Sequence, residues 1–111
     1  MDIHYLQIDG EKYPAVFSMA ATEDIVKEFG GMEAMSSGLI EQDPSVIGKM
    51  LNILISAGIE YCELKGKEHP HLPKGRLTAL MSVKETQEIV SQIFNLMTDD
   101  AGRTVEVSSK N

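Results

Sequence analysis

The chain has 111 residues, of which 42% are hydrophobic and 24% charged, a balance that fits one globular domain and argues against a disordered chain. Its 17 Asp and Glu residues outnumber its 10 Lys and Arg residues, and the net charge of −7 disfavours binding to nucleic acid or to an anionic membrane. The single cysteine, Cys62, excludes an intramolecular disulfide. The N-terminus lacks the basic and then apolar pattern of a signal peptide, so we expect a cytoplasmic location.

Residues 2–18 predict a β-hairpin. The expected strands are Ile3–Ile8 and Lys12–Phe17, and between them stands Asp-Gly, the dipeptide that favours a tight hairpin turn. Pro14 has no N–H to donate, which places it at a sheet edge. A two-stranded hairpin is marginal alone, so we expect it to pack on helices.

Two short helices are expected next. Thr22 is a good N-cap for the first, and two acidic residues follow it in the first turn. Gly30-Gly31 ends this helix. Apolar residues between Met32 and Leu39 predict a second helical segment, which the Ser-Ser-Gly sequence at 36–38 is expected to break.

The longest predicted element begins at Asp43 and Pro44, a capping residue followed by a residue suited to the first helical position. From Val46 to Leu64 apolar residues cover most of the helix circumference, which indicates a central helix buried on several sides. Lys49 and Glu60 lie inside it, and a charge at mid-bilayer costs about 2.5–3.5 kcal/mol, so we favour a core helix over a membrane span. Such burial in a small chain also suggests a subunit interface.

The last third of the chain predicts a loop and one further helix. Residues 65–75 contain Pro, Gly and His and form the loop, and 77–81 form a helical turn. Ser82 and Glu85 match the reciprocal capping box, and apolar residues repeat at helical spacing as far as Met97.

Together these elements predict an α+β fold, mainly α, with an N-terminal β-hairpin and about four to five helices in one small domain. We assign the domain to residues 1–102, with the hairpin at 2–18 and helices within 22–98. Residues 103–111 are predicted to form a flexible C-terminal tail, and the alternating residues 104–107 leave a strand in a larger assembly as the alternative.

The sequence contains no recognisable catalytic, cofactor-binding or metal site, so we expect a protein that is not an enzyme and needs no cofactor. Cys62, His69 and His71 are the nearest to a ligand set, but a structural zinc site needs four ligands, and we favour exposed loop histidines and a buried thiol. Asp99 and Asp100 are expected on the solvated surface rather than around a calcium ion.

Three stretches of the chain carry a family resemblance. They are the hairpin Tyr5–Pro14, the helix and following segment Ile25–Met35, and the Leu-rich turn and helix Leu77–Met97. In this order they resemble the tail assembly chaperones of long-tailed siphophages and prophages, and the similarity covers most of residues 3–98.

The resemblance implies a non-enzymatic protein of the host bacterial cytoplasm. Such chaperones bind the tape measure protein, a long helical polypeptide, and keep it soluble until tail tube subunits polymerise around it. Several members of the family self-associate into spirals, so a homo-oligomer is implied as well. An acidic surface with Met- and Ile-rich helical grooves suits this role, because a helix with an apolar stripe docks into such grooves.

We expect the partner-binding surface to use apolar positions of the two long helices, with Met50, Leu54, Ile93 and Met97 as the candidates. Core packing is the alternative role for the same four residues. Two other functions remain open: a structural component of the virion, such as a connector or minor tail protein, and a small cytosolic regulatory or metal-responsive protein.

Overall fold

The computed structural model describes residues 1–102, which begin with the predicted β-hairpin. Strands β1 (His4–Ile8) and β2 (Glu11–Ala15) pair in antiparallel orientation. Asp9 and Gly10 join them with positive φ angles of 53° and 84°, the backbone that a type I′ turn requires. The hairpin prediction is therefore confirmed, with strands slightly shorter than expected.

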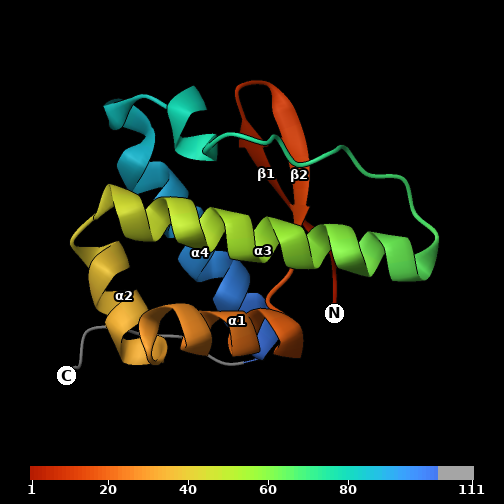
Figure 1. Cartoon of the computed structure of the whole chain (residues 1–111), viewed down its shortest axis with the longest axis horizontal. Helices are drawn as coiled ribbons and strands as arrows, with labels where there is room; N and C mark the ends of the chain where they lie inside the picture. The colour runs from red at the N-terminus through yellow and green to blue at the C-terminus, as the bar shows by residue number, and fades with distance from the viewer. Residues whose placement is uncertain (103–111) are drawn as a thin grey trace.

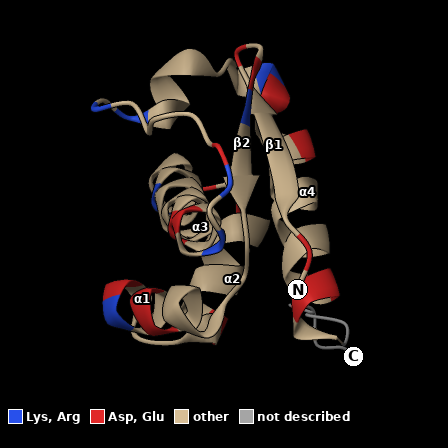
Figure 2. Ribbon diagram, turned by 90° about the vertical axis from the view of Figure 1, so that its right-hand side faces the viewer, with Lys and Arg blue, Asp and Glu red and all other residues tan. Residues whose placement is uncertain are grey.

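Four α-helices and two short 3₁₀ turns follow within the described part of the chain. They are α1 (Met19–Phe29), α2 (Met32–Ile40), α3 (Pro44–Lys65), η1 (Leu77–Leu80), η2 (Val83–Glu85) and α4 (Thr86–Ala101). In Figure 1 helix α3 crosses the front of the molecule, with the hairpin and α4 behind it and α1 and α2 beneath. The side view in Figure 2 places the hairpin between α3 and α4. The fold is α+β and mainly α, as predicted.

Helix α3 is the central element, as its apolar circumference predicts. It contacts β2, α1, α2, η1 and α4. Its inward-facing residues are fully buried: Met50, Leu51, Leu54 and Ile55. No helix within residues 1–102 combines the length and the apolar character that a bilayer crossing demands.

The edge of β2 is covered by α3 through direct backbone contact. The N–H of Val16 donates to the carbonyl oxygen of Leu54 over 3.2 Å. One turn further along α3, Gly58 lies against the backbone of Pro14 and Ala15, where a Cβ would overlap the Pro14 carbonyl. Pro14 therefore lies at a sheet edge, as predicted, but this edge is buried rather than open.

Two predictions about the short helices are wrong. Helix α1 begins at Met19 and is capped by Ser18, four residues before the predicted cap Thr22, and the Ser18 side chain accepts the N–H of Ala21. This earlier start puts Ala21 and Ile25 on one buried face. Helix α2 continues without a break through residues 36–38, because Ser36 is buried and Gly38 lets Val46 of α3 approach closely.

The C-terminal part follows the prediction more closely. Ser82 and Glu85 form the capping box at η2, which leads directly into α4. Helix α4 extends to Ala101, three residues beyond the expected limit of 98, and Gly102 caps it with a φ of 71°. The predicted flexible tail, residues 103–111, lies outside the described residues.

Candidate functional site

The four residues predicted to bind a partner are all in the core. Met50 and Leu54 on α3, and Ile93 and Met97 on α4, each have 0% of their surface exposed. The expectation that they offer an accessible groove is therefore wrong. The reason is that the apolar faces of α3 and α4 are both needed to enclose the core of a chain of 111 residues.

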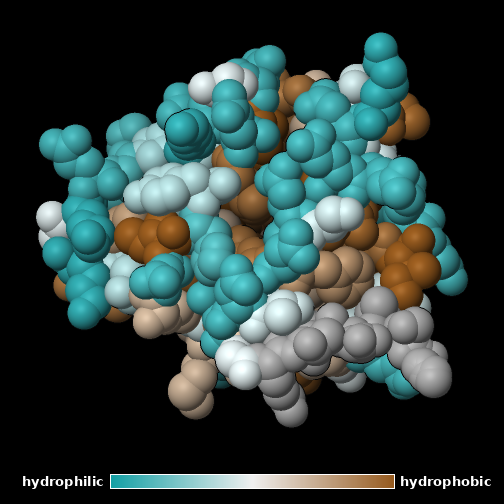
Figure 3. All heavy atoms as spheres, turned by 180° about the vertical axis from the view of Figure 1, so that it is seen from behind, coloured by the Kyte–Doolittle hydropathy of each residue, from teal (hydrophilic) through white to brown (hydrophobic). Residues whose placement is uncertain are grey.

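Large apolar side chains reach the surface on other elements. Val26 on α1 and Ile40 on α2 are about half exposed, at 47% and 48%. Leu80 and Val83, at 42% and 90% exposure, lie where η1 leads into η2. We call residues 80–83 the 80–83 turn. Seen from behind in Figure 3, the molecule has a mainly hydrophilic surface that apolar side chains reach at separate places.

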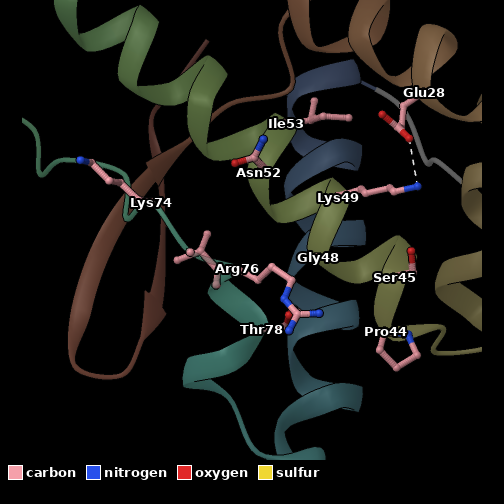
Figure 4. A pocket seen from close by; sticks show the side chains of 12 residues that line it. Glu28, Pro44, Ser45, Gly48, Lys49, Asn52, Ile53, Lys74, Arg76 and Thr78 are labelled. Atoms are coloured by element: carbon pink, nitrogen blue, oxygen red, sulfur yellow. Dashed lines mark ion pairs between the residues drawn. The ribbon is translucent and has the colours of Figure 1, made fainter.

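A cleft of about 750 Å³ opens along one side of α3. It lies between α3, the end of α1 and the segment 74–78, as Figure 4 shows. We call it the α3 cleft, and it is lined by Glu28, Pro44, Ser45, Gly48, Lys49, Asn52, Ile53, Lys74, Gly75, Arg76, Leu77 and Thr78. The cleft therefore combines charged, hydroxyl, amide and apolar groups.

Positive charge predominates in the α3 cleft. Lys49 forms an ion pair with Glu28, with Nζ and Oε2 separated by 3.0 Å. Within residues 1–102 neither Lys74 nor Arg76 has a carboxylate at ion-pair distance. In Figure 4 the Arg76 side chain extends along the face of α3 toward Thr78, whereas Lys74 points away from it at the other end.

The residues considered for metal binding do not form a ligand set. Cys62 is buried on α3, and the ring centroids of His69 and His71 are 6.4 Å apart. His69 is engaged already, since its Nε2 lies 3.2 Å from Glu63 and its Nδ1 lies 2.9 Å from the carbonyl oxygen of Pro70. Among residues 1–102 no three His, Cys, Asp or Glu side chains are placed to share a metal ion. His71 is exposed as predicted, but the His69 side chain is only 15% exposed.

The prediction of a solvated Asp100 is also wrong. Its side chain is only 3% exposed and lies 3.1 Å from Nε2 of His4. The same carboxylate accepts the N–H of Phe17 over 2.7 Å. Asp100 thus joins the end of α4 to both ends of the hairpin, which is a structural role, while Asp99 is exposed as expected.

No family model, curated protein or solved structure matches the chain. Sequence reasoning missed the α3 cleft because it assigned residues 65–75 only as a loop. The signal present in the sequence is Lys74-Gly75-Arg76, two neighbouring cations in a chain of net charge −7.

Proposed function

We propose that this protein is a tail assembly chaperone of a siphophage or prophage, which binds the tape measure protein in the bacterial cytoplasm and keeps it soluble. In this proposal it has no catalytic activity and needs no cofactor. The proposal rests on the family resemblance of the three stretches named above. Its physical logic is that an acidic protein bound to an apolar helix adds charge to the complex and opposes aggregation.

The observation that carries the proposal is the exposure of Leu80 and Val83. Both belong to Leu77–Met97, one of the stretches that resemble the family. An apolar stripe on a partner helix buries its surface only against apolar side chains that are accessible, as these two are. They replace the buried residues of α3 and α4 as the proposed contact.

Co-expression with the tape measure protein of the same phage tests the function. The soluble fraction of the tape measure protein should rise with the wild-type chain and fall back with the double variant L80S/V83S. The matched control is V26S/I40S, which also removes two exposed apolar side chains, from α1 and α2. All four positions are exposed, so each substitution should change the free energy of unfolding by only about 0.5 kcal/mol.

The outcomes test the chaperone function and the role of the 80–83 turn separately. A tape measure protein that stays insoluble beside the wild-type chain contradicts the chaperone function. Full activity of L80S/V83S contradicts the 80–83 turn as the contact, and so does an equal loss in both double variants.

Two alternative functions have their own tests. A connector or minor tail protein stays in the mature particle, whereas a chaperone leaves it, so mass spectrometry of purified virions distinguishes them. A metal-responsive regulator would bind zinc at micromolar concentration in equilibrium dialysis, which we do not expect because His69 is engaged by Glu63 and Pro70.

A further inference from the structure

We propose that the α3 cleft binds a small phosphate ester, a function separate from the protein binding proposed above. The cleft has a volume of about 750 Å³. Small-molecule sites typically range from roughly 300 to 1,000 Å³, so its size suits a ligand such as a nucleotide or a sugar phosphate.

The charge of the cleft opposes that of the rest of the chain. The whole chain carries a net charge of −7, yet the cleft is lined by three cations, Lys49, Lys74 and Arg76, and one carboxylate, that of Glu28. An anion approaching the protein is repelled by most of the surface and attracted here. Since Arg76 has no carboxylate partner within residues 1–102, its charge is free to be neutralised by a ligand.

The arrangement of donors favours a phosphate over a carboxylate. The Arg76 guanidinium presents N–H groups in a planar fork, and such a fork binds two oxygens of one phosphate. The hydroxyl-bearing residues Ser45 and Thr78 line the same cleft, and Figure 4 shows the Arg76 side chain reaching toward Thr78, whereas Lys49 extends toward Glu28. A phosphate dianion has three terminal oxygens for the Arg76 fork and the Thr78 hydroxyl toward which that side chain extends, whereas a carboxylate has only two.

The remaining lining accommodates the body of the ester. Pro44, Ile53 and Leu77 contribute apolar surface to the cleft, and Gly48 between them carries no side chain. The side-chain amide of Asn52 adds a donor and an acceptor for polar edges. A ligand with both a phosphate and a flat or apolar body therefore contacts more of the cleft than inorganic phosphate does.

Glu28 opposes binding in this arrangement. Its carboxylate holds Nζ of Lys49 at 3.0 Å, and both side chains are about half exposed. The Glu28 charge repels a bound phosphate and also neutralises the attraction that Lys49 would exert on it. Removing the charge at Glu28 and removing that at Arg76 should therefore have opposite effects on affinity.

The test is an NMR titration of the ¹⁵N-labelled full chain at constant ionic strength. The probes are AMP, inorganic phosphate, adenosine and succinate. We expect saturable shifts at the amides of Gly48, Lys49, Arg76 and Thr78, with AMP binding more tightly than phosphate and adenosine giving none. Succinate, a dianion of two carboxylates, should bind more weakly than phosphate.

Variants connect the shifts to the cleft. R76Q should weaken AMP binding by about tenfold, the effect of losing a charge-assisted hydrogen bond. E28Q should tighten it. K84Q is the matched control, because Lys84 is exposed on η2 and does not line the cleft. Dispersed spectra of each variant establish that it is folded.

Several results overturn the proposal. The first is the absence of saturable shifts with both AMP and phosphate at millimolar concentration. Equal binding of succinate contradicts the phosphate selectivity. Equal loss in R76Q and K84Q, or weaker binding by E28Q, shows that the cations of the cleft do not hold the ligand.

Discussion

At the scale of single residues, Gly58 is the position where the fold leaves no space. An added Cβ would overlap the carbonyl oxygen of Pro14 and lie 2.6 Å from the backbone nitrogen of Ala15. Backbone atoms do not give way as a flexible side chain does. We expect Gly58→Ala to lower the free energy of unfolding by about 1–3 kcal/mol, measured by urea denaturation.

Gly48 provides the matched control, because it lies on the same helix. A Cβ there meets only the side chain of Thr78, with the methyl group at 3.3 Å and the hydroxyl oxygen at 3.7 Å. Both substitutions replace Gly by Ala inside α3, which by helix propensity alone stabilises the fold by about 1 kcal/mol. The difference between their free energies of unfolding therefore isolates the contact with β2. If G58A and G48A are equally stable, the close packing of β2 against α3 is contradicted.

At the scale of elements, the start of α4 depends on the ionisation of Glu85. Its carboxylate accepts the backbone N–H of Ser82 over 2.8 Å and the Ser82 hydroxyl over 3.0 Å. Both hydrogen bonds favour the charged form and lower the pKa of Glu85, with the backbone bond contributing most. The cap therefore stabilises the helix fully above the ordinary glutamate pKa, and this contribution is lost as the pH falls through the lowered value.

An NMR titration of the Glu85 side-chain carboxyl carbon measures this pKa directly. Ser82→Ala should raise it only part of the way, because the backbone N–H still donates. Glu85→Gln keeps an acceptor but does not ionise, so the protection of the Ser82 amide, its exchange rate relative to an unstructured chain at the same pH, should no longer change in the acidic range. A pKa unchanged in the Ser82 variant would mean that the hydroxyl plays no part.

The same elements show which features a sequence can predict. The Asp-Gly turn, Pro44 at the start of α3 and the capping box are local signals, and each marks its element correctly. The start of α1 depends on more than local chemistry. Ser18 and Thr22 are both good caps, and the choice follows from burying Ala21 and Ile25 against the core.

The candidate sites were harder to predict because they depend on contacts between distant segments. Periodicity identifies the apolar face of a helix but not what covers it, so it cannot decide between partner binding and core packing for Met50 and Ile93, which the core encloses. The α3 cleft exists only because residues 74–78 lie against α3, which begins thirty residues earlier at Pro44. Asp100 likewise becomes buried through its contacts with His4 and Phe17.

At the scale of the whole molecule, two opposing terms govern association between copies. The net charge of −7 repels one copy from another, and Figure 2 shows acidic residues on the hairpin turn, α1 and α4. The exposed apolar side chains, of which Val83 is among the most accessible at 90%, favour contact. Salt screens the repulsion without weakening apolar contacts, with a Debye length of about 10 Å at 0.1 M and ~3 Å at 1 M.

If the chain forms the homo-oligomer that the family resemblance implies, its association should therefore strengthen with salt. Light scattering after size-exclusion chromatography should give a mass that rises with protein concentration and rises further when NaCl is increased from 0.1 M to 1 M. L80S/V83S should shift this curve to higher concentration if the 80–83 turn contributes, while V26S/I40S reports on α1 and α2.

A mass that falls with salt would assign association to ion pairs, and a monomer under every condition would remove self-association from the proposed function. A chain that stays monomeric could still bind the tape measure protein, because contact with a partner helix through the 80–83 turn does not require two copies of this chain to associate. Co-expression alone would then decide whether the chain is a chaperone.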